Sequence, residues 1–228
     1  MKPKAIVLLS AGLDSTTNLF LAQRELDVVM TLTFDYGQKA AQKEIECAKN
    51  ISEKCGVKNE VVCLPWLKGL GKSSLTSEQK EIPKGSQISI ENAKVSLDTA
   101  KAVWVPNRNG IFLNIAAGFA ESLGAQTIIP GFNAEEAATF PDNSYEFIRS
   151  LRKSFSFSTQ NHVDVQCYTV GMSKTEIVKI GNDLMIPFKM IWPCYQNLNQ
   201  WCGECESCVR AKRAFRLNRV DLLGNFLK

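Results

Sequence analysis

A run of small and polar residues directly follows the first apolar segment of the chain. The apolar segment, residues 5–9, reads Ala-Ile-Val-Leu-Leu, and the polar run, residues 10–17, reads Ser-Ala-Gly-Leu-Asp-Ser-Thr-Thr. A helix expected over residues 16–25 would gather free backbone N–H groups at its positive end, where a phosphate can bind. The Asp14 carboxylate can hold a metal ion or orient a nucleotide. The alternative is an ordinary strand-to-helix turn, in which these residue types are common.

Four cysteines in the last part of the chain have the spacing of a metal site. Cys202, Cys205 and Cys208 form two successive C-x2-C steps, and Cys194 lies a short loop upstream. Four thiolates with no open position favour a structural zinc ion over a catalytic one. Spacing alone does not choose the metal, so an iron–sulfur cluster and a redox pair remain alternatives. Three nearby cations are expected to offset the thiolate charge: Arg210, Lys212 and Arg213.

Composition points to a cytoplasmic globular protein. The chain has 228 residues, begins without a secretory signal, and contains no apolar stretch that approaches a membrane span. A net charge of +4 is too small to demand nucleic acid but suits anionic substrates. Cysteines without a signal peptide indicate a reducing compartment and metal binding rather than disulfides. Outside the cluster, four cysteines are expected to be small core residues: Cys47, Cys55, Cys63 and Cys167.

The elements that must position these residues alternate along the chain. Strands are expected over residues 5–9, 28–34, 59–63, 127–131 and 165–169, and helices over 16–25, 40–55, 109–123, 143–160 and 173–184. This alternation predicts an α/β fold with a doubly wound, mostly parallel five-stranded sheet. Ligands bind at the carboxyl ends of such strands, so Ser10, Asp35, Gly131 and Gly171 are expected to face one crevice.

Local signals refine this reading. An Asn within residues 107–109 is expected to cap the following helix, and Ser173 with Glu176 is expected to form a capping box. Residues 68–102 have weak periodicity and are expected to be the least ordered stretch, as a mobile lid or a plain surface excursion. Two units are expected: a nucleotide-binding domain over residues 1–188 and a zinc-binding segment with a C-terminal helix over 189–228.

The first loop resembles the SGGxDS pyrophosphatase loop of the adenine nucleotide alpha-hydrolase superfamily. It departs from that pattern at Ala11, which replaces a glycine. Nearly the whole chain resembles the 7-cyano-7-deazaguanine synthase family of queuosine precursor biosynthesis. The matching segments are residues 8–17, 34–38 (Phe-Asp-Tyr-Gly-Gln), 105–109, 131–134, 141–142, 172–177, 192–195 and 202–208. Asn107, Asn143 and the segment 133–140 are further departures.

The resemblance implies an ATP-dependent ligase with structural zinc and magnesium-bound ATP. It would convert 7-carboxy-7-deazaguanine and ammonia to 7-cyano-7-deazaguanine through an adenylated carboxylate and an amide. The expected catalytic residues are Asp14, Ser15, Arg108 and Lys174. The expected nucleotide-binding residues are Leu8, Leu9, Ser10, Ala11, Gly12, Leu13, Asp14, Ser15, Thr16, Thr17 and Asn18. The expected substrate-binding residues are Tyr36, Gln38, Asn109, Phe132, Asn133 and Asp142.

Several assignments have alternatives. Glu135 or Glu136 could accept hydrogen bonds from the base or lie in a surface loop, and Phe132 or Phe140 could stack on the base or pack in the core. The only histidine, His162, lies in a polar turn, so no cysteine-type glutaminase is expected and free ammonia is the expected nitrogen donor.

The expected partners are therefore small molecules, with no nucleic acid and no membrane, in a monomer or a homodimer. Two other functions stay open. One is a diverged enzyme that joins a deazaguanine acid or tRNA base to a different amine or sulfur acceptor, although Cys167, expected at a strand centre, argues against thiolation. The other is a noncatalytic zinc module that binds nucleic acid through residues 210–219.

Overall fold

A single five-stranded parallel sheet forms the centre of the molecule, in the order β3-β2-β1-β4-β5. The structure, a computed structural model, describes residues 1–227. The strands are β1 (Lys4–Leu8), β2 (Asp27–Asp35), β3 (Asn59–Cys63), β4 (Thr127–Ile129) and β5 (Asp164–Val165). The predicted α/β fold with a doubly wound parallel sheet is confirmed.

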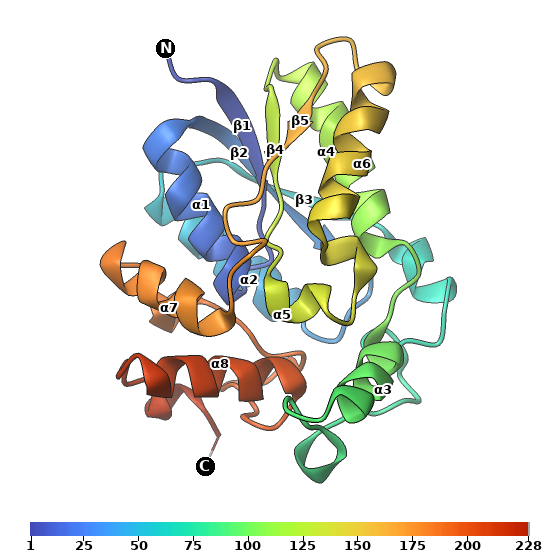
Figure 1. The fold of residues 1–228 in the computed structure, drawn as a ribbon, viewed down its shortest axis with the longest axis vertical. Helices are drawn as coiled ribbons and strands as arrows, with labels where there is room; N and C mark the ends of the chain where they lie inside the picture. Colours follow the sequence, from blue (N-terminus) through green and yellow to red (C-terminus); the bar gives the residue numbers. More distant parts are fainter. Residues whose placement is uncertain (228) are drawn as a thin grey trace.

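Helices cover both faces of the sheet (Figure 1). On one side lie α1 (Leu13–Glu25), α2 (Ala41–Lys54) and α7 (Lys174–Asp183), and on the other lie α4 (Arg108–Ser122) and α6 (Tyr145–Ser158). Alternation along β1 explains the two layers, because Ala5 and Val7 join the core beneath α1 and α2 while Ile6 joins the core beneath α4 and α6. The other helices are α3 (Ala93–Val103), α5 (Ala134–Ala137), α8 (Glu206–Leu217) and the 3₁₀ turns η1 (Pro65–Gly69), η2 (Gly85–Gln87), η3 (Pro141–Asn143), η4 (Phe188–Met190) and η5 (Leu223–Asn225).

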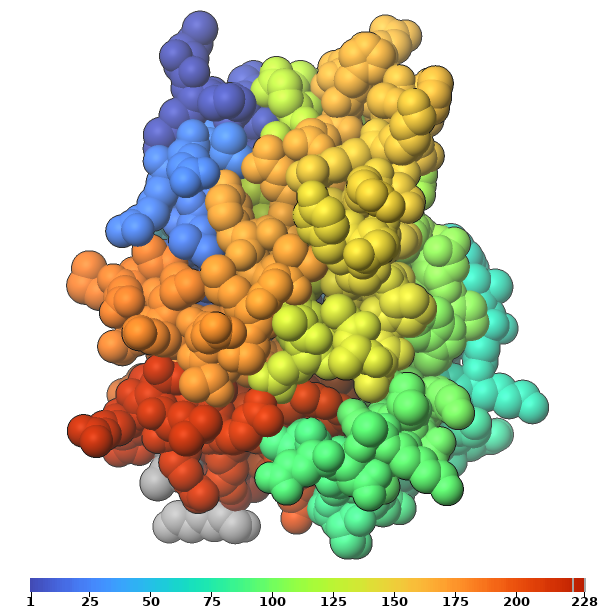
Figure 2. All heavy atoms as spheres, viewed as in Figure 1, coloured from blue at the N-terminus to red at the C-terminus, as the bar shows by residue number. Residues whose placement is uncertain are grey.

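The C-terminal helix α8 packs against α7 and adds to the core beneath α1. Phe215 of α8 packs in this core with Trp201, whose ring is 6.2 Å away between centroids. In the space-filling view, the α3 segment lies against α8, although more than ninety residues separate them in sequence (Figure 2). Residues 68–102 were expected to be the least ordered stretch. Regular structure between residues 70 and 92 is limited to η2, but the segment ends in the regular helix α3, whose first turn is capped by Asn92.

Two local predictions were wrong and one is confirmed. Asn107 precedes α4 in the left-handed conformation, with φ of 51°, and its side chain does not cap the helix. The last strand ends at Val165, so Cys167 lies beyond it rather than at a strand centre. The capping box of α7 is confirmed, because Ser173 Oγ accepts from the Glu176 N–H and the Glu176 carboxylate accepts from the Ser173 N–H.

The other cysteines differ from the expectation that all four lie in the core. Cys63 is exposed, whereas Cys47, Cys55 and Cys167 are partly buried. Among the described residues, no helix combines the length and apolar character needed to cross a bilayer.

Candidate active site

A cavity of about 220 Å³ opens at the carboxyl ends of β1, β2 and β4. Its wall includes residues from the loops after these strands, from the start of α4 and α7, and from the segment before the cysteine cluster: Ser10, Gly12, Asp14, Ser15, Tyr36, Gln38, Glu44, Arg108, Asn109, Gly131, Phe132, Glu136, Asn143, Lys174, Trp192 and Tyr195. Of the residues expected to face one crevice, Ser10 and Gly131 line this cavity, whereas Asp35 and Gly171 are not part of its wall.

The loop after β1 presents an uncapped helix end to the cavity. Ala11 has φ of 58°, the left-handed conformation that a glycine adopts at lower cost, and its carbonyl accepts from the Trp192 N–H at 2.8 Å. Gly12 is the N-cap of α1 and supplies no side-chain hydrogen bond to the first turn. Ser10 Oγ lies 3.2 Å from Ser15 Oγ. The first-turn N–H groups of α1, flanked by two hydroxyls, can therefore donate to an anion.

Gly131 allows the loop after β4 to approach this helix end. A Cβ at position 131 would lie 2.6 Å from both Cα and N of Ser15. Only glycine fits there without displacing the backbone at the start of α1.

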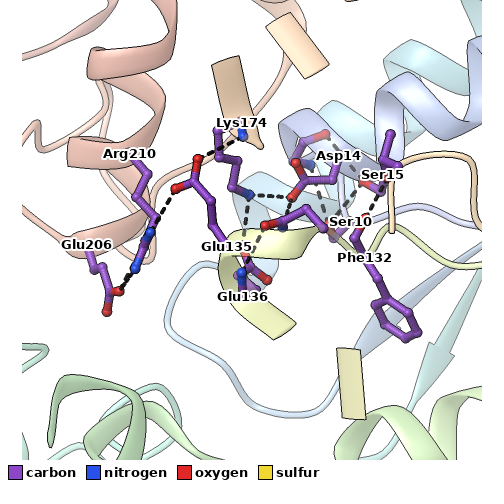
Figure 3. A network of polar contacts seen from close by, with 12 residues as sticks. Ser10, Asp14, Ser15, Phe132, Glu135, Glu136, Lys174, Glu206 and Arg210 are labelled. Atoms are coloured by element: carbon purple, nitrogen blue, oxygen red, sulfur yellow. Dashed lines mark hydrogen bonds and ion pairs between the residues drawn. The ribbon is translucent and has the colours of Figure 1, made fainter. Parts of the chain in front are cut away.

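Lys174 links two carboxylates in the cavity wall (Figure 3). Its Nζ is hydrogen-bonded to Asp14 Oδ2 and lies 2.9 Å from Glu136 Oε1. Asn133 Nδ2 also donates to Asp14 Oδ2, at 3.1 Å. The other oxygen, Asp14 Oδ1, is buried and has no hydrogen-bond partner within residues 1–227.

Burial and ion pairing oppose one another in this cluster. Burial raises the pKa of Asp14 to about 6, although Lys174 lowers it, and Glu136 adds to the rise. Burial also favours neutral Lys174, but the carboxylates of Asp14 and Glu136 hold its pKa above the usual range. The lysine is therefore a cation in the cavity wall, next to the start of α1.

A second ion network contacts the backbone of Lys174 (Figure 3). Glu135 accepts from the Lys174 backbone N–H at 2.9 Å, and its carboxylate pairs with Arg210 at 2.8 Å and with Arg213 at 2.5 Å. Arg210 in turn pairs with Glu206 at 2.7 Å, and Glu206 accepts from Thr99 of α3 at 3.0 Å. The network thereby connects α3, α5, α7 and α8.

This network corrects two expectations. Arg210 and Arg213 pair with carboxylates rather than with the cysteine cluster. Lys212 does lie near the cluster: it lines a surface hollow with Cys202 and Cys205, and its ammonium lies over the Phe226 ring, 5.3 Å from its centroid. Glu135 is already held by two arginines, so it is neither a base acceptor nor a loose surface residue.

The opposite wall contains the loop after β2 and the start of α4. Arg108 donates to the Tyr36 hydroxyl at 3.2 Å. Gln38 Nε2 donates to Phe34 O and to Glu44 Oε2, both at 2.9 Å. Burial raises the pKa of Glu44 to about 7, against the effects of the Gln38 hydrogen bond and of Arg108, and Asp35 adds a smaller rise. The sequence analysis did not single out Glu44, because a Glu within a charged helix is usually a solvated residue.

The remaining predicted residues fall into two groups. Asn109 Nδ2 donates to the Asp142 carbonyl at 3.4 Å, and Asn143 donates to the Asp142 carboxylate at 3.2 Å, which places these polar groups together beside the cavity. Five other predicted residues are fully buried: Ala11, Thr16, Thr17, Asn18 and Asn133. Neither these five nor Asp142 are part of the cavity wall.

Asn18 instead links α1 to the segment after β5 through hydrogen bonds. Its amide donates to Asp14 O at 2.9 Å and to Thr169 Oγ1 at 2.6 Å, and Thr169 Oγ1 donates to Phe132 O. Phe132 lines the cavity and its ring is 6.4 Å from that of Phe147. Phe140 also lines it and stacks on Trp104.

The sulfur atoms of the four-cysteine cluster all lie within 4.8 Å of one another. Cys202 Sγ and Cys208 Sγ are 3.9 Å apart, close to the roughly 3.8 Å that a tetrahedron with Zn–S bonds of about 2.3 Å requires. Backbone N–H groups of Cys202 and Cys205 point at cluster sulfurs at 3.3 Å, as suits thiolate acceptors. The donor set and spacing fit a closed tetrahedral metal site, and Cys194 also borders the cavity.

Comparison with known families gives a match over most of the chain. A family model described as "Queuosine biosynthesis protein QueC" matches residues 4–219. The 7-cyano-7-deazaguanine synthase of Bdellovibrio bacteriovorus is 55% identical over 220 residues, which cover 96% of this chain and 95% of that protein. The enzyme of the same name from Carboxydothermus hydrogenoformans is 53% identical over 211 residues, covering 92% of this chain and 97% of its own.

A solved structure of a 4-thiouridine synthetase–RNA complex with bound ATP is similar in fold. Its TM-score is 0.55 at 17% identity, and the match covers 96% of this chain and 50% of that one. At this identity the likeness concerns the fold alone.

Proposed function

The chain belongs to the queuosine biosynthesis protein QueC family, and from that premise we propose how its cavity carries out the ATP-dependent synthesis of 7-cyano-7-deazaguanine. The substrates would be ATP, ammonia and 7-carboxy-7-deazaguanine. A carboxylate resists attack by ammonia, so one of its oxygens must first become a leaving group. Adenylation makes AMP that leaving group.

The observation that carries this proposal is the uncapped start of α1, which opens into the cavity beside Lys174. The polyphosphate of ATP would accept hydrogen bonds from the first-turn N–H groups and from Ser10 and Ser15. Lys174 would then stabilise negative charge as pyrophosphate leaves, because its ammonium is already fixed by two carboxylates. Fixed donors of this kind need no rearrangement during the reaction.

Arg108 and the polar groups near η3 would bind the acid on the opposite wall. Arg108 places its guanidinium beside Tyr36, and the Asn109, Asp142 and Asn143 groups offer donors and acceptors to a guanine-like ring. Phe132, held by Thr169, offers an apolar contact for the ring. Ammonia would convert the adenylate to an amide, and a second activation of the amide oxygen would yield the nitrile.

Two sites in the protein have side chains that suit a metal ion. Asp14 Oδ1, buried and without a hydrogen-bond partner within residues 1–227, would hold Mg²⁺, which neutralises phosphate charge when bound with ATP. Cys194, Cys202, Cys205 and Cys208 would hold structural Zn²⁺. A closed set of four thiolates leaves no position for substrate, so this metal would stabilise the segment that contributes Trp192 and Tyr195 to the cavity.

The test is mass spectrometry of products after incubation with Mg-ATP, ammonium and 7-carboxy-7-deazaguanine. We expect the nitrile, with AMP formed only when the acid is present. AMP without the nitrile would mean that the acceptor is a different amine, and no AMP in a metal-replete protein would overturn the proposal.

A further inference from the structure

Five charged side chains line the cavity, and two of them, Arg108 and Glu44, form no ion pair within residues 1–227. Asp14 and Glu136 are both paired with Lys174, and Arg108 lies over the Tyr36 ring, 5.7 Å from its centroid. Glu44 forms no ion pair within residues 1–227, and its only side-chain partner there is the neutral amide of Gln38. Arg108 influences the Glu44 carboxylate electrostatically but forms no ion pair with it, so the carboxylate can pair with a small cation that enters the cavity.

The Glu44 carboxylate is held in place by its surroundings. The Gln38 side chain donates to Glu44 Oε2 and to Phe34 O, and its own carbonyl accepts from the Tyr36 N–H. Gln38 is fixed at each end and so fixes the orientation of the carboxylate. Glu44 Oε1 has no hydrogen-bond partner within residues 1–227 and remains available to a ligand.

The proposed reaction consumes an amine that is protonated in neutral water. Ammonium has no free electron pair and cannot attack a carbonyl carbon, so a group in the cavity must accept its proton. We propose that Glu44 binds the incoming ammonium ion and acts as the general base that releases ammonia. This inference rests on the proposed function and adds a residue to it.

The local electrostatics support such a role. Burial raises the pKa of Glu44 to about 7, although the Gln38 hydrogen bond and Arg108 oppose the rise, and Asp35 adds to it. A carboxylate tuned near neutral pH is a far better proton acceptor than one with an ordinary pKa of about 4.3.

The step balances as follows. Ammonium transfers one proton to Glu44, and the freed electron pair of nitrogen attacks the carbonyl carbon of the adenylate. The C–N bond forms, the C–O bond to the AMP phosphate breaks, and the phosphate oxygen leaves with the bonding electrons. The second surplus proton passes from nitrogen to the phosphate, leaving the amide, AMP and protonated Glu44.

If Glu44 bound ATP instead of ammonium, its substitution would affect different rate constants. A carboxylate can also accept hydrogen bonds from ribose hydroxyls, in which case Glu44 would contribute to ATP binding rather than to ammonia delivery. The two roles separate because formation of the adenylate requires ATP and the acid but no amine.

The experiment compares the wild type with Glu44→Gln, which keeps the size of the side chain and can still accept from Gln38. Three rates are measured near neutral pH: acid-dependent ATP–pyrophosphate exchange, amide formation with varied ammonium, and hydroxamate formation with hydroxylamine, which is uncharged at that pH. Glu53→Gln is the matched control, because Glu53 is an exposed residue of the same helix.

We expect Glu44→Gln to raise the KM for ammonium by about tenfold or more while exchange and hydroxamate formation stay within about twofold of wild type. Loss of exchange, or a KM for ATP that rises while the KM for ammonium does not, would assign Glu44 to ATP and overturn the inference. An unchanged KM for ammonium would overturn it as well. Failure of the wild type to catalyse acid-dependent exchange would instead contradict the proposed function.

Discussion

Lys174 is the residue on which the charge balance of the cavity wall depends. It is buried, and it lies between Asp14 and Glu136, so the wall carries one fixed cation for two carboxylates. Removing the cation would leave two acidic groups facing the polyphosphate of ATP. In the proposed function, this fixed pairing would serve both ATP binding and catalysis.

We expect Lys174→Met to lower kcat/KM for ATP by about 10²–10³ in acid-dependent ATP–pyrophosphate exchange, the usual cost of removing one fixed transition-state donor. Lys179→Met is the control, since Lys179 is an exposed residue of the same helix. Equal losses in the two variants would show that the effect is not local to the cavity.

Glu44 gives a prediction about stability and pH. Its pKa is about 7 in the folded protein, against about 4.3 in an unfolded chain, so the folded state binds the proton more tightly. The stability from this proton is fully present below about pH 4 and is lost as the pH rises through 7. Glutamine does not titrate, so Glu44→Gln does not lose this stability as the pH rises. The unfolding free energy of the variant relative to wild type should therefore rise by about 1–3 kcal/mol between pH 4 and pH 8. Urea titrations at both pH values measure it, and a pH-independent difference would contradict it.

At the scale of elements, the cavity depends on how closely two loops approach each other. The loop after β4 meets the start of α1 at Gly131, and the loop after β1 meets the segment before the cysteine cluster through the Ala11 carbonyl and the Trp192 N–H. Both contacts involve backbone atoms, so the position of these loops does not depend on the side chains at the contact points.

Gly131→Ala should therefore displace the start of α1. We expect an unfolding free energy lower by about 1–3 kcal/mol and a kcat/KM for ATP lower by at least about tenfold. Gly118→Ala is the matched control, because nothing lies within 4 Å of a Cβ at that exposed helical position and the substitution should stabilise by up to about 1 kcal/mol. Thermal unfolding and exchange assays on both variants separate the two cases.

The elements were predictable where the hydrophobic pattern is strong. All five strands overlap the ranges predicted from the alternation of apolar runs and helical segments, although β5 does so only at Val165, and the helices on both faces of the sheet were predicted as well. The pattern failed at α3, whose amphipathic face becomes clear only against α8, and at Asn107, whose left-handed conformation depends on its place before α4.

The site was predictable from sequence in its motifs but not in its pairings. The loop over residues 10–15 and the cysteine cluster are local patterns, and their positions follow from strand order. Glu135 pairs with Arg210 across 75 residues, and Glu44 lines the cavity from a helix without a motif. No local signal records such long-range contacts, because they arise only when α5, α7 and α8 pack together.

For the molecule as a whole, the cysteine cluster anchors the segment that closes one end of the cavity. Cys208 lies on α8, the helix that also supplies Arg210, and Cys194 borders the cavity. A metal ion held by this cluster would therefore stabilise both the cavity wall and the ion network behind Lys174.

We expect about one zinc ion per chain, and we expect Cys208→Ser to bind it poorly and to unfold roughly 10 °C or more below wild type. Metal analysis and thermal unfolding measure both effects. Cys63→Ser is the control, since Cys63 is exposed and lies outside the cluster. A metal-free protein with wild-type thermal stability would contradict a structural role.

The network through Arg210 also constrains the order of events during synthesis. Asp14 is made early, Glu135 near the middle and Arg210 close to the end of the chain, yet the first is tied to the last through Lys174. Until α8 has been synthesised, Glu135 lacks both of its arginine partners. The ion network behind Lys174 is therefore complete only after α8 has been synthesised, so its last contacts form at the end of translation.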